Sequence, residues 1–129
     1  MASIFTKIIN GEIPAHIVAE NDNYFAFLDI NPLVEGHTLV IPKTEVDYIF
    51  DIDDAVLSGL MLFAKKVAKQ IESVIPCERI GVTVIGLEVP HAHVHLVPMN
   101  QMSDMNFSNP KKKFTTEQLT RTAAKIKNV

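Results

Sequence analysis

Three histidines at alternate positions are the most chemically distinctive feature of this sequence. His91, His93 and His95 lie within the run His-Ala-His-Val-His-Leu-Val-Pro, and the whole chain contains only five histidines. The small and β-branched residues between them predict a strand over 91–97, in which successive side chains point to opposite faces. The three imidazoles should therefore share one face, and the apolar residues between them should take the other.

A row of imidazoles is poor core material, because each ring has polar atoms that need partners. It could be a solvated face, or an HxH pair could bind zinc. Alternatively, neutral imidazole attacks phosphorus that carries a nitrogen or phosphate leaving group, and water later opens the phosphohistidine. For that chemistry His93 is the geometric choice of nucleophile, because the rings of His91 and His95 can reach oxygens on both sides of it.

The elements that position these histidines follow from hydrophobic periodicity and turn residues. The longest predicted helix carries an apolar stripe from Val56 to Val74, and two acidic residues before it could act as N-terminal caps. Strands with one long inserted helix indicate an α+β protein with a five-stranded antiparallel meander sheet. The other predicted elements are strands at 16–20, 24–29, 37–43 and 79–85, short helices at 3–9 and 44–50, a loop over 99–114, and a last helix capped by Thr115 or Thr116.

Length, net charge and cysteine content exclude several classes of function. The length of 129 residues suits one domain, 1–129, and a net charge of −3 argues against a nucleic-acid partner. The single cysteine, Cys77, excludes a disulfide within one chain and a cysteine zinc cluster. The sequence has no apolar run of membrane-spanning length and no signal-peptide pattern, so we expect a cytoplasmic protein without a membrane partner.

The histidine run and two upstream segments resemble the histidine-triad (HIT) family. The histidines are followed by Leu-Val-Pro, and residues 26–32 and 36–43 resemble the nucleoside-binding half of that family. Residues 4–14 resemble its N-terminal segment. The resemblance implies a HIT-like fold with one long helix, a short N-terminal helix and a C-terminal helix, and with residues 99–129 appended to the core.

The resemblance also implies roles for particular residues. His93 matches the family's nucleophile, and His91, His95 and His37 match residues that orient it and bind phosphate. Asp29 matches the acid that binds the ribose hydroxyls. A backbone carbonyl of His91 that accepts a hydrogen bond from His93 would fix the tautomer of the nucleophile. The expected nucleotide-binding residues, which would otherwise be plain core, are Phe5, Ile8, Phe27, Leu28, Ile30 and Val89.

Two departures from the family pattern bear on the chemistry. Some members bind zinc through Cys-x-x-Cys and a histidine, whereas this chain has Ser3, Thr6 and Glu45 at those places, so we expect no structural metal and no cofactor. The segment before the triad, residues 84–90, is shorter than in many members and lacks their amide side chains. Phosphate contacts would then come from backbone N–H groups at 86–89 or from the 99–109 loop.

The leading functional hypothesis is a phosphoramidase-like hydrolase or transferase that cleaves a purine nucleoside 5′-monophosphate from a small amine. Three alternatives stay open: a non-catalytic nucleotide- or partner-binding module, a dinucleoside polyphosphate hydrolase, and a metal-dependent hydrolase built on the histidine row with Asp104. The resemblance further implies a homodimer.

Overall fold

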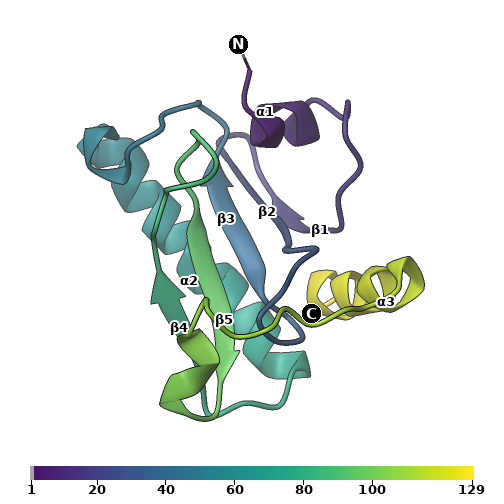
Figure 1. Ribbon diagram of the computed structural model, residues 1–129. Coiled ribbons are helices and arrows are strands. Elements are labelled where there is room, and N and C mark those ends of the chain that lie inside the picture. The colour runs from purple at the N-terminus through teal and green to yellow at the C-terminus, as the bar shows by residue number, and fades with distance from the viewer. Residues whose placement is uncertain (1) are drawn as a thin grey trace.

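Five strands form one antiparallel sheet in the computed structural model, which describes residues 2–129 (Figure 1). The order β1-β2-β3-β5-β4 means that the first three strands form a meander. The chain then crosses to the outer strand β4 and returns as β5 between β3 and β4. The predicted α+β class is confirmed. The strands are β1 (Ile17–Glu20), β2 (Tyr24–Leu28), β3 (Thr38–Pro42), β4 (Arg79–Thr83) and β5 (Val94–Met99).

The helices begin where the sequence places capping residues. The hydroxyl of Ser3 accepts a hydrogen bond from the backbone N–H of Thr6, and Thr115 forms a capping box with Gln118. Asp53 stands at the N-cap of the long helix, but its side chain makes no capping hydrogen bond. The helices are α1 (Ile4–Ile9), α2 (Asp54–Val74) and α3 (Thr116–Lys127), with short 3-10 turns η1 (Ile49–Asp51) and η2 (Met102–Met105).

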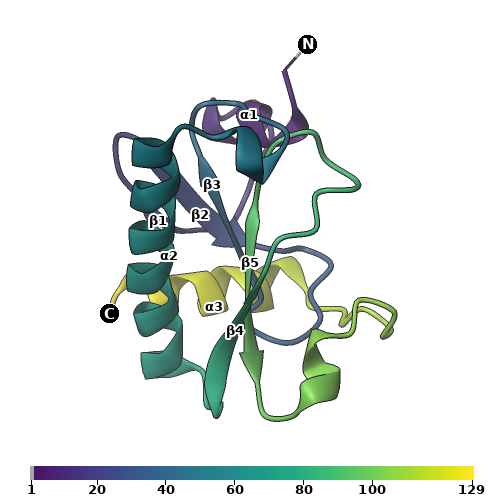
Figure 2. The same ribbon diagram turned by 90° about the vertical axis from the view of Figure 1, so that its left-hand side faces the viewer.

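Different elements cover the two faces of the sheet. Helix α2 lies along one face, where its buried stripe, which includes Leu60, Val67 and Ile71, packs against Val94 and Leu96 (Figure 2). A smaller apolar cluster lies on the other face beneath α1. Figure 2 shows the loops before and after β5 on the side opposite α2, so that face carries a helix at one end and loops along the rest. No helix among residues 2–129 has the length and apolar character needed to cross a membrane.

The strand that carries the histidines starts later than predicted. Strand β5 begins at Val94 and extends to Met99, whereas 91–97 was expected. The residues before it bond elsewhere: the N–H of Ala92 donates to the carbonyl of Val46, and the N–H of His91 donates to the carbonyl of Val89. The predicted sharing of faces still holds, because Ala92 belongs with the core on the α2 side.

The helix expected at 44–50 is wrong, and only the turn η1 forms in that region. The Val46 carbonyl is engaged by Ala92, and the Glu45 side chain accepts a hydrogen bond from the N–H of Ser3 at 2.7 Å. These bonds to distant residues compete with a helix, and residues 43–48 form bends without regular secondary structure. The predicted strand at 79–85 ends at Thr83, and the long loop after β5 contains η2.

A substitution at Gly59, inside α2, tests how closely this helix packs on the sheet. A Cβ atom at Gly59 would overlap the hydroxyl of Tyr24, which donates to the Val56 carbonyl at 2.9 Å. Helix propensity alone predicts that Gly59→Ala stabilises the protein by about 1 kcal/mol. We expect the opposite, a loss of about 1–3 kcal/mol in the free energy of unfolding from overpacking. Urea denaturation measures it, with the exposed Ser58→Ala as control, and a more stable Gly59→Ala variant would contradict this packing.

Candidate active site

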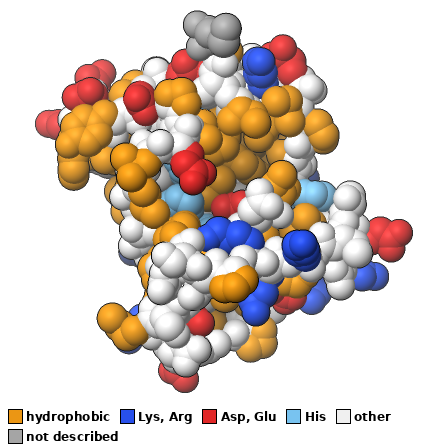
Figure 3. Space-filling model, in the orientation of Figure 1, with side chains coloured by type: hydrophobic (Ala, Val, Ile, Leu, Met, Phe, Trp, Pro, Cys, Tyr) orange, Lys and Arg blue, Asp and Glu red, His pale blue; other side chains and the backbone are white. Residues whose placement is uncertain are grey.

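Four of the five histidines gather in one buried cluster. His37, His91, His93 and His95 are at most 7% exposed. The ring centroids of His93 and His95 are 5.0 Å apart, and those of His37 and His95 are 5.2 Å apart. The space-filling view shows histidine at the floor of a hollow, with hydrophobic side chains above it and basic side chains below (Figure 3). The structure thus brings together the four histidines singled out in the sequence.

The ring of His91 is fixed by groups on both of its nitrogens. Its Nε2 lies 2.8 Å from the carbonyl oxygen of Pro42. A carbonyl can only accept, so Nε2 must carry the hydrogen. Its Nδ1 is then an acceptor, and it receives a hydrogen bond from the hydroxyl of Ser3 at 2.8 Å. Burial lowers the pKa of His91, which favours this neutral ring.

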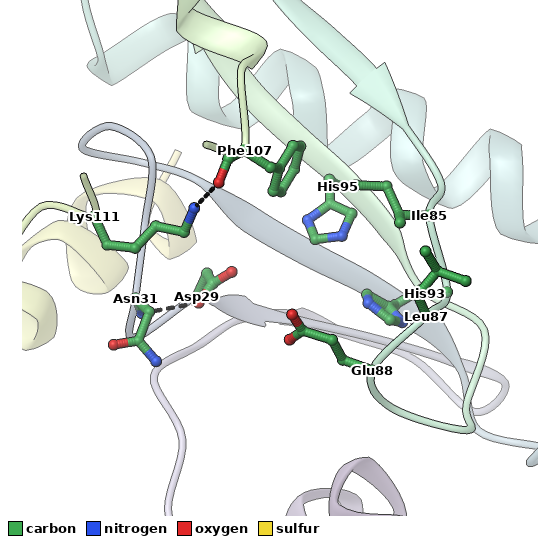
Figure 4. A pocket seen from close by; sticks show the side chains of 10 residues that line it. Asp29, Asn31, Ile85, Leu87, Glu88, His93, His95, Phe107 and Lys111 are labelled. Carbon is green, nitrogen blue, oxygen red and sulfur yellow. Dashed lines mark hydrogen bonds between the residues drawn. The ribbon is translucent and has the colours of Figure 1, made fainter. Parts of the chain in front are cut away.

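The tautomer of His93 is set by the main chain of His91. Its Nδ1 lies 2.8 Å from the His91 carbonyl oxygen, so Nδ1–H donates and Nε2 keeps a lone pair. This is the hydrogen bond expected from the sequence. The edge-on ring of Phe5 packs 5.0 Å from the His93 ring. Figure 4 shows His93 facing an open cavity, so the free lone pair is available to a bound molecule.

His37 and His95 form a second hydrogen-bonded chain. The backbone N–H of Leu33 donates to Nδ1 of His37 at 3.0 Å, so the His37 hydrogen sits on Nε2. That Nε2–H donates to Nδ1 of His95 at 3.0 Å, which leaves the hydrogen of neutral His95 on Nε2. Burial lowers the pKa of His37 to about 3 and that of His95 to about 4. Both rings are therefore neutral at pH 7.

Asp29 follows β2 and lies beside this chain. Its Oδ1 accepts a hydrogen bond from the N–H of Asn31 at 2.8 Å, and its Oδ2 lies 3.7 Å from Nε2 of His37. Burial raises the pKa of Asp29, while the Asn31 N–H acts in the opposite direction. The carboxylate keeps unused acceptor capacity toward the cavity.

Two cavities of similar size meet at the nucleophile candidate. One, of about 280 Å³, is mainly apolar, and the other, of about 290 Å³, is more polar. His93, His95 and Asp29 line both. The apolar cavity is lined by every residue that the sequence assigned to nucleotide binding: Phe5, Ile8, Phe27, Leu28, Ile30 and Val89.

Two residues that the sequence did not assign to the site also line the polar cavity. The ring of Phe107 packs edge-on against His95 at 4.9 Å and against His37 at 6.0 Å. Lys111 donates to the Phe107 carbonyl at 2.6 Å and lies over its ring. The other residues of the 99–109 loop, from which phosphate contacts were expected, include Asn100 and Asn106, which line neither cavity. The side-chain oxygen of Asn100 accepts from the N–H of Glu78, and that of Asn106 accepts from the N–H of Ser108.

The residues at the positions of the family's zinc ligands do cluster, but they do not suit zinc. The Glu45 carboxylate accepts from the Thr6 hydroxyl at 2.6 Å and from the Ser3 N–H, and these bonds lower the pKa of Glu45 to about 2. Two neutral hydroxyls stand where zinc prefers thiolates or imidazoles. Hydrogen bonds thus join α1, the 42–46 segment and His91.

A second cluster of metal-binding residue types lies at Asp29, His37 and His95, whose ligand atoms fall within 4.8 Å of one another. A metal would need a lone pair on Nε2 of His37. The Leu33 N–H already requires the Nδ1 lone pair, so a neutral ring carries its hydrogen on Nε2. The hydrogen bonding therefore does not fit a metal there.

The antiparallel sheet, its α2 layer and the buried histidine row define a histidine-triad protein. The HIT domain family model matches residues 10–102, and the chain belongs to this family. The crystal structure of a HIT-like protein from Bartonella henselae, described as involved in cell-cycle regulation and with unknown ligand, superposes with a TM-score of 0.84. It is 33% identical, and the match covers 98% of this chain and 94% of that one.

Other relatives include proteins with a stated activity or metal. The adenosine 5′-monophosphoramidase of Saccharomyces cerevisiae is 40% identical over 99 residues, which cover 75% of this chain and 62% of the relative. A zinc-bound histidine triad family protein from Mycobacterium smegmatis has a TM-score of 0.80 at 25% identity, covering 99% of this chain and 97% of that one.

The buried neutral histidines make stability depend on pH. An unfolded histidine takes up a proton near pH 6.5, whereas folded His37 and His95 do so only near 3 and 4. The unfolded state therefore binds more protons as the pH falls from 6.5 to 5. We expect the free energy of unfolding to fall by up to about 1.4 kcal/mol per pH unit for each ring.

Urea denaturation across this pH range measures the effect. His37→Gln should flatten the slope, and His16→Gln, at a histidine outside the cluster, should leave the contribution of the buried rings in place. A wild-type protein whose stability stays constant or rises toward pH 5 would contradict the neutral assignment.

Proposed function

We propose that this HIT protein hydrolyses purine nucleoside 5′-phosphoramidates through a covalent nucleotidyl intermediate on His93. The observation that carries the proposal is the hydrogen bond from His93 Nδ1–H to the His91 carbonyl. It leaves the Nε2 lone pair at the junction of two cavities. The activity printed for the yeast relative, adenosine 5′-monophosphoramidase, supports the same reaction class.

The apolar cavity is the proposed nucleoside site. Its aromatic and aliphatic lining, with Phe5 and Phe27 among its members, suits the faces of a purine base. Asp29 lines both cavities, and its carboxylate would accept hydrogen bonds from the ribose hydroxyls. The 5′-phosphate then falls beside His93 and His95.

In the first step, Nε2 of His93 attacks the phosphorus and the P–N bond breaks. The electron pair of that bond goes to the leaving nitrogen, which takes a proton from solvent and departs as an amine. The imidazole becomes an N-phosphorylated imidazolium, whose Nδ1–H still donates to the carbonyl of His91. That carbonyl dipole stabilises the positive charge as it forms.

In the second step, water attacks the phosphorus and the P–N bond to His93 breaks. The electron pair returns to Nε2, and the products are neutral imidazole, nucleoside monophosphate and one proton. The Nε2–H of His95 would donate to a non-bridging oxygen in both steps, and the hydrogen bond from His37 to Nδ1 of His95, which leaves the hydrogen on Nε2, supports this role. His37 acts through His95 and is buried away from solvent.

The proposal predicts that His93→Ala lowers kcat on adenosine 5′-phosphoramidate by at least about a thousandfold. His16→Ala should retain full turnover, and a chelator should leave the wild-type rate unchanged. Release of AMP, measured by liquid chromatography, gives the rate. A variant without His93 that keeps wild-type turnover, or a wild type that a chelator inactivates, would overturn the mechanism. AMP binding without turnover would indicate a binding module.

We also propose that the protein forms a homodimer through β4 and α2. Strand β4 is an outer strand of the sheet, so one of its edges is free to pair with a second copy. Val82 on β4 is 52% exposed and Leu62 on α2 is 68% exposed, and the two elements are in contact. A two-fold axis beside β4 would cover both apolar side chains at once.

Light scattering at micromolar concentration tests the dimer. We expect the wild type to have twice the mass of the chain, and we expect Val82→Lys to be monomeric because it would place like charges opposite each other across the axis. Val129→Lys, a change at an exposed terminal residue, should remain dimeric. A monomeric wild type, or a dimeric Val82→Lys, would refute this interface.

A further inference from the structure

The proposed function fills only one of the two cavities that meet at His93. The nucleoside takes the apolar cavity, while the polar cavity extends past the histidines to the segment between η2 and α3. The polar cavity has a volume of about 290 Å³, room for a group of several heavy atoms. It is lined by residues of three loops, among them Leu87, Glu88, Phe107 and Lys111.

The geometry of phosphoryl transfer indicates that the leaving group departs into this second cavity. In phosphoryl transfer the attacking and leaving atoms lie roughly in line on opposite sides of the phosphorus. A leaving group displaced by His93 therefore departs away from His93. Figure 4 shows Lys111 across the cavity from His93, with Phe107 beside it. The leaving amine and its substituents would pass toward this pair.

Lys111 offers a cation with spare hydrogen-bonding capacity. Its ammonium has three donors: the Phe107 carbonyl takes one at 2.6 Å and the Asn109 carbonyl a second, longer one at 3.5 Å, which leaves one donor for a ligand. Within residues 2–129, the Lys111 ammonium has no carboxylate at salt-bridge distance. Lys111 is the only lysine or arginine that lines the polar cavity in this described part of the chain.

The other charged groups of the cavity give an anion a preferred orientation. Glu88 lines both cavities and, in Figure 4, extends toward the space between Asp29 and His93. Asp29 is the proposed ribose ligand. An additional anion would be repelled by Glu88 and attracted by the ammonium of Lys111, whose charge also acts on Asp29. The negative end of a leaving group should thus lie at the Lys111 end of the cavity.

We propose that the polar cavity is the leaving-group site, and that Lys111 selects amines that carry a carboxylate, such as an amino acid joined to phosphorus through its nitrogen. This inference rests on the proposed phosphoramidate hydrolysis. The family model ends at residue 102, so Phe107 and Lys111 belong to a part of the chain beyond the match. They give this protein a selectivity that the matched region does not encode.

Two matched substrates test the proposal: adenosine 5′-phosphoramidate linked through nitrogen to glycine, and the same compound linked to glycinamide. They differ in one charge, and the comparison between variants cancels their different intrinsic reactivities. We expect Lys111→Ala to lower kcat/KM for the glycine compound about tenfold more than for the glycinamide compound. Lys111→Glu should shift the preference further toward glycinamide. Lys113→Ala, an exposed lysine outside the cavity, should leave the ratio unchanged.

Each other outcome contradicts the proposal in a distinct way. Equal losses on both substrates in Lys111→Ala would mean that Lys111 binds the phosphate common to both, and unchanged rates on both would mean that it binds neither group. A wild type that cleaves neither compound, nor adenosine 5′-phosphoramidate itself, would overturn the proposed function together with the leaving-group site.

Discussion

The hydrogen bond from Nδ1 of His93 to the carbonyl oxygen of His91 is the interaction on which the rest of the site depends. It requires the backbone of His91 to stay in place, and that backbone is not held by the sheet. The His91 ring bonds to the Pro42 carbonyl and to the Ser3 hydroxyl, and Ala92 bonds to Val46. The N-terminal helix, the segment after β3 and His93 are consequently one hydrogen-bonded unit.

The partners of the histidine rings explain why the cluster tolerates burial. His37 is held by the backbone N–H of Leu33, and His91 and His93 donate to backbone carbonyls. Burial lowers the pKa of His37, His91 and His95 and keeps these rings neutral, although the Pro42 carbonyl by itself acts to raise the pKa of His91. The single carboxylate beside the chain, Asp29, lies 3.7 Å from Nε2 of His37, beyond hydrogen-bond distance. Neutral rings are what a nucleophile and a hydrogen-bond donor to phosphate both need at pH 7.

The sequence predicted what depends on local pattern. The apolar stripe of α2, the caps at Ser3 and Thr115, and the shared face of the histidines all follow from spacing within a few residues. The hydrogen bond at His93 was expected from the family resemblance, and it too joins residues that are close in sequence.

The predictions from sequence were wrong where the local structure depends on contacts between segments that are distant in sequence. The start of β5 and the missing helix at 44–50 both depend on the bond between Ala92 and Val46, which no local pattern reveals. The arrival of Phe107 and Lys111 at the site was missed for the same reason. Both residues lie in the segment predicted only as a loop, 99–114, where no hydrophobic period indicates which side chains face the histidines.

The proposed chemistry depends on the tautomers of the four clustered histidines, and nitrogen NMR measures these tautomers directly. Long-range ¹H–¹⁵N correlation spectra of uniformly labelled protein, recorded well above the ordinary histidine pKa, distinguish the two neutral forms of each ring. We predict the Nδ1–H form for His93 alone, and the Nε2–H form for His37, His91 and His95. A His93 ring with its hydrogen on Nε2 would have no lone pair facing the cavity and would contradict the account.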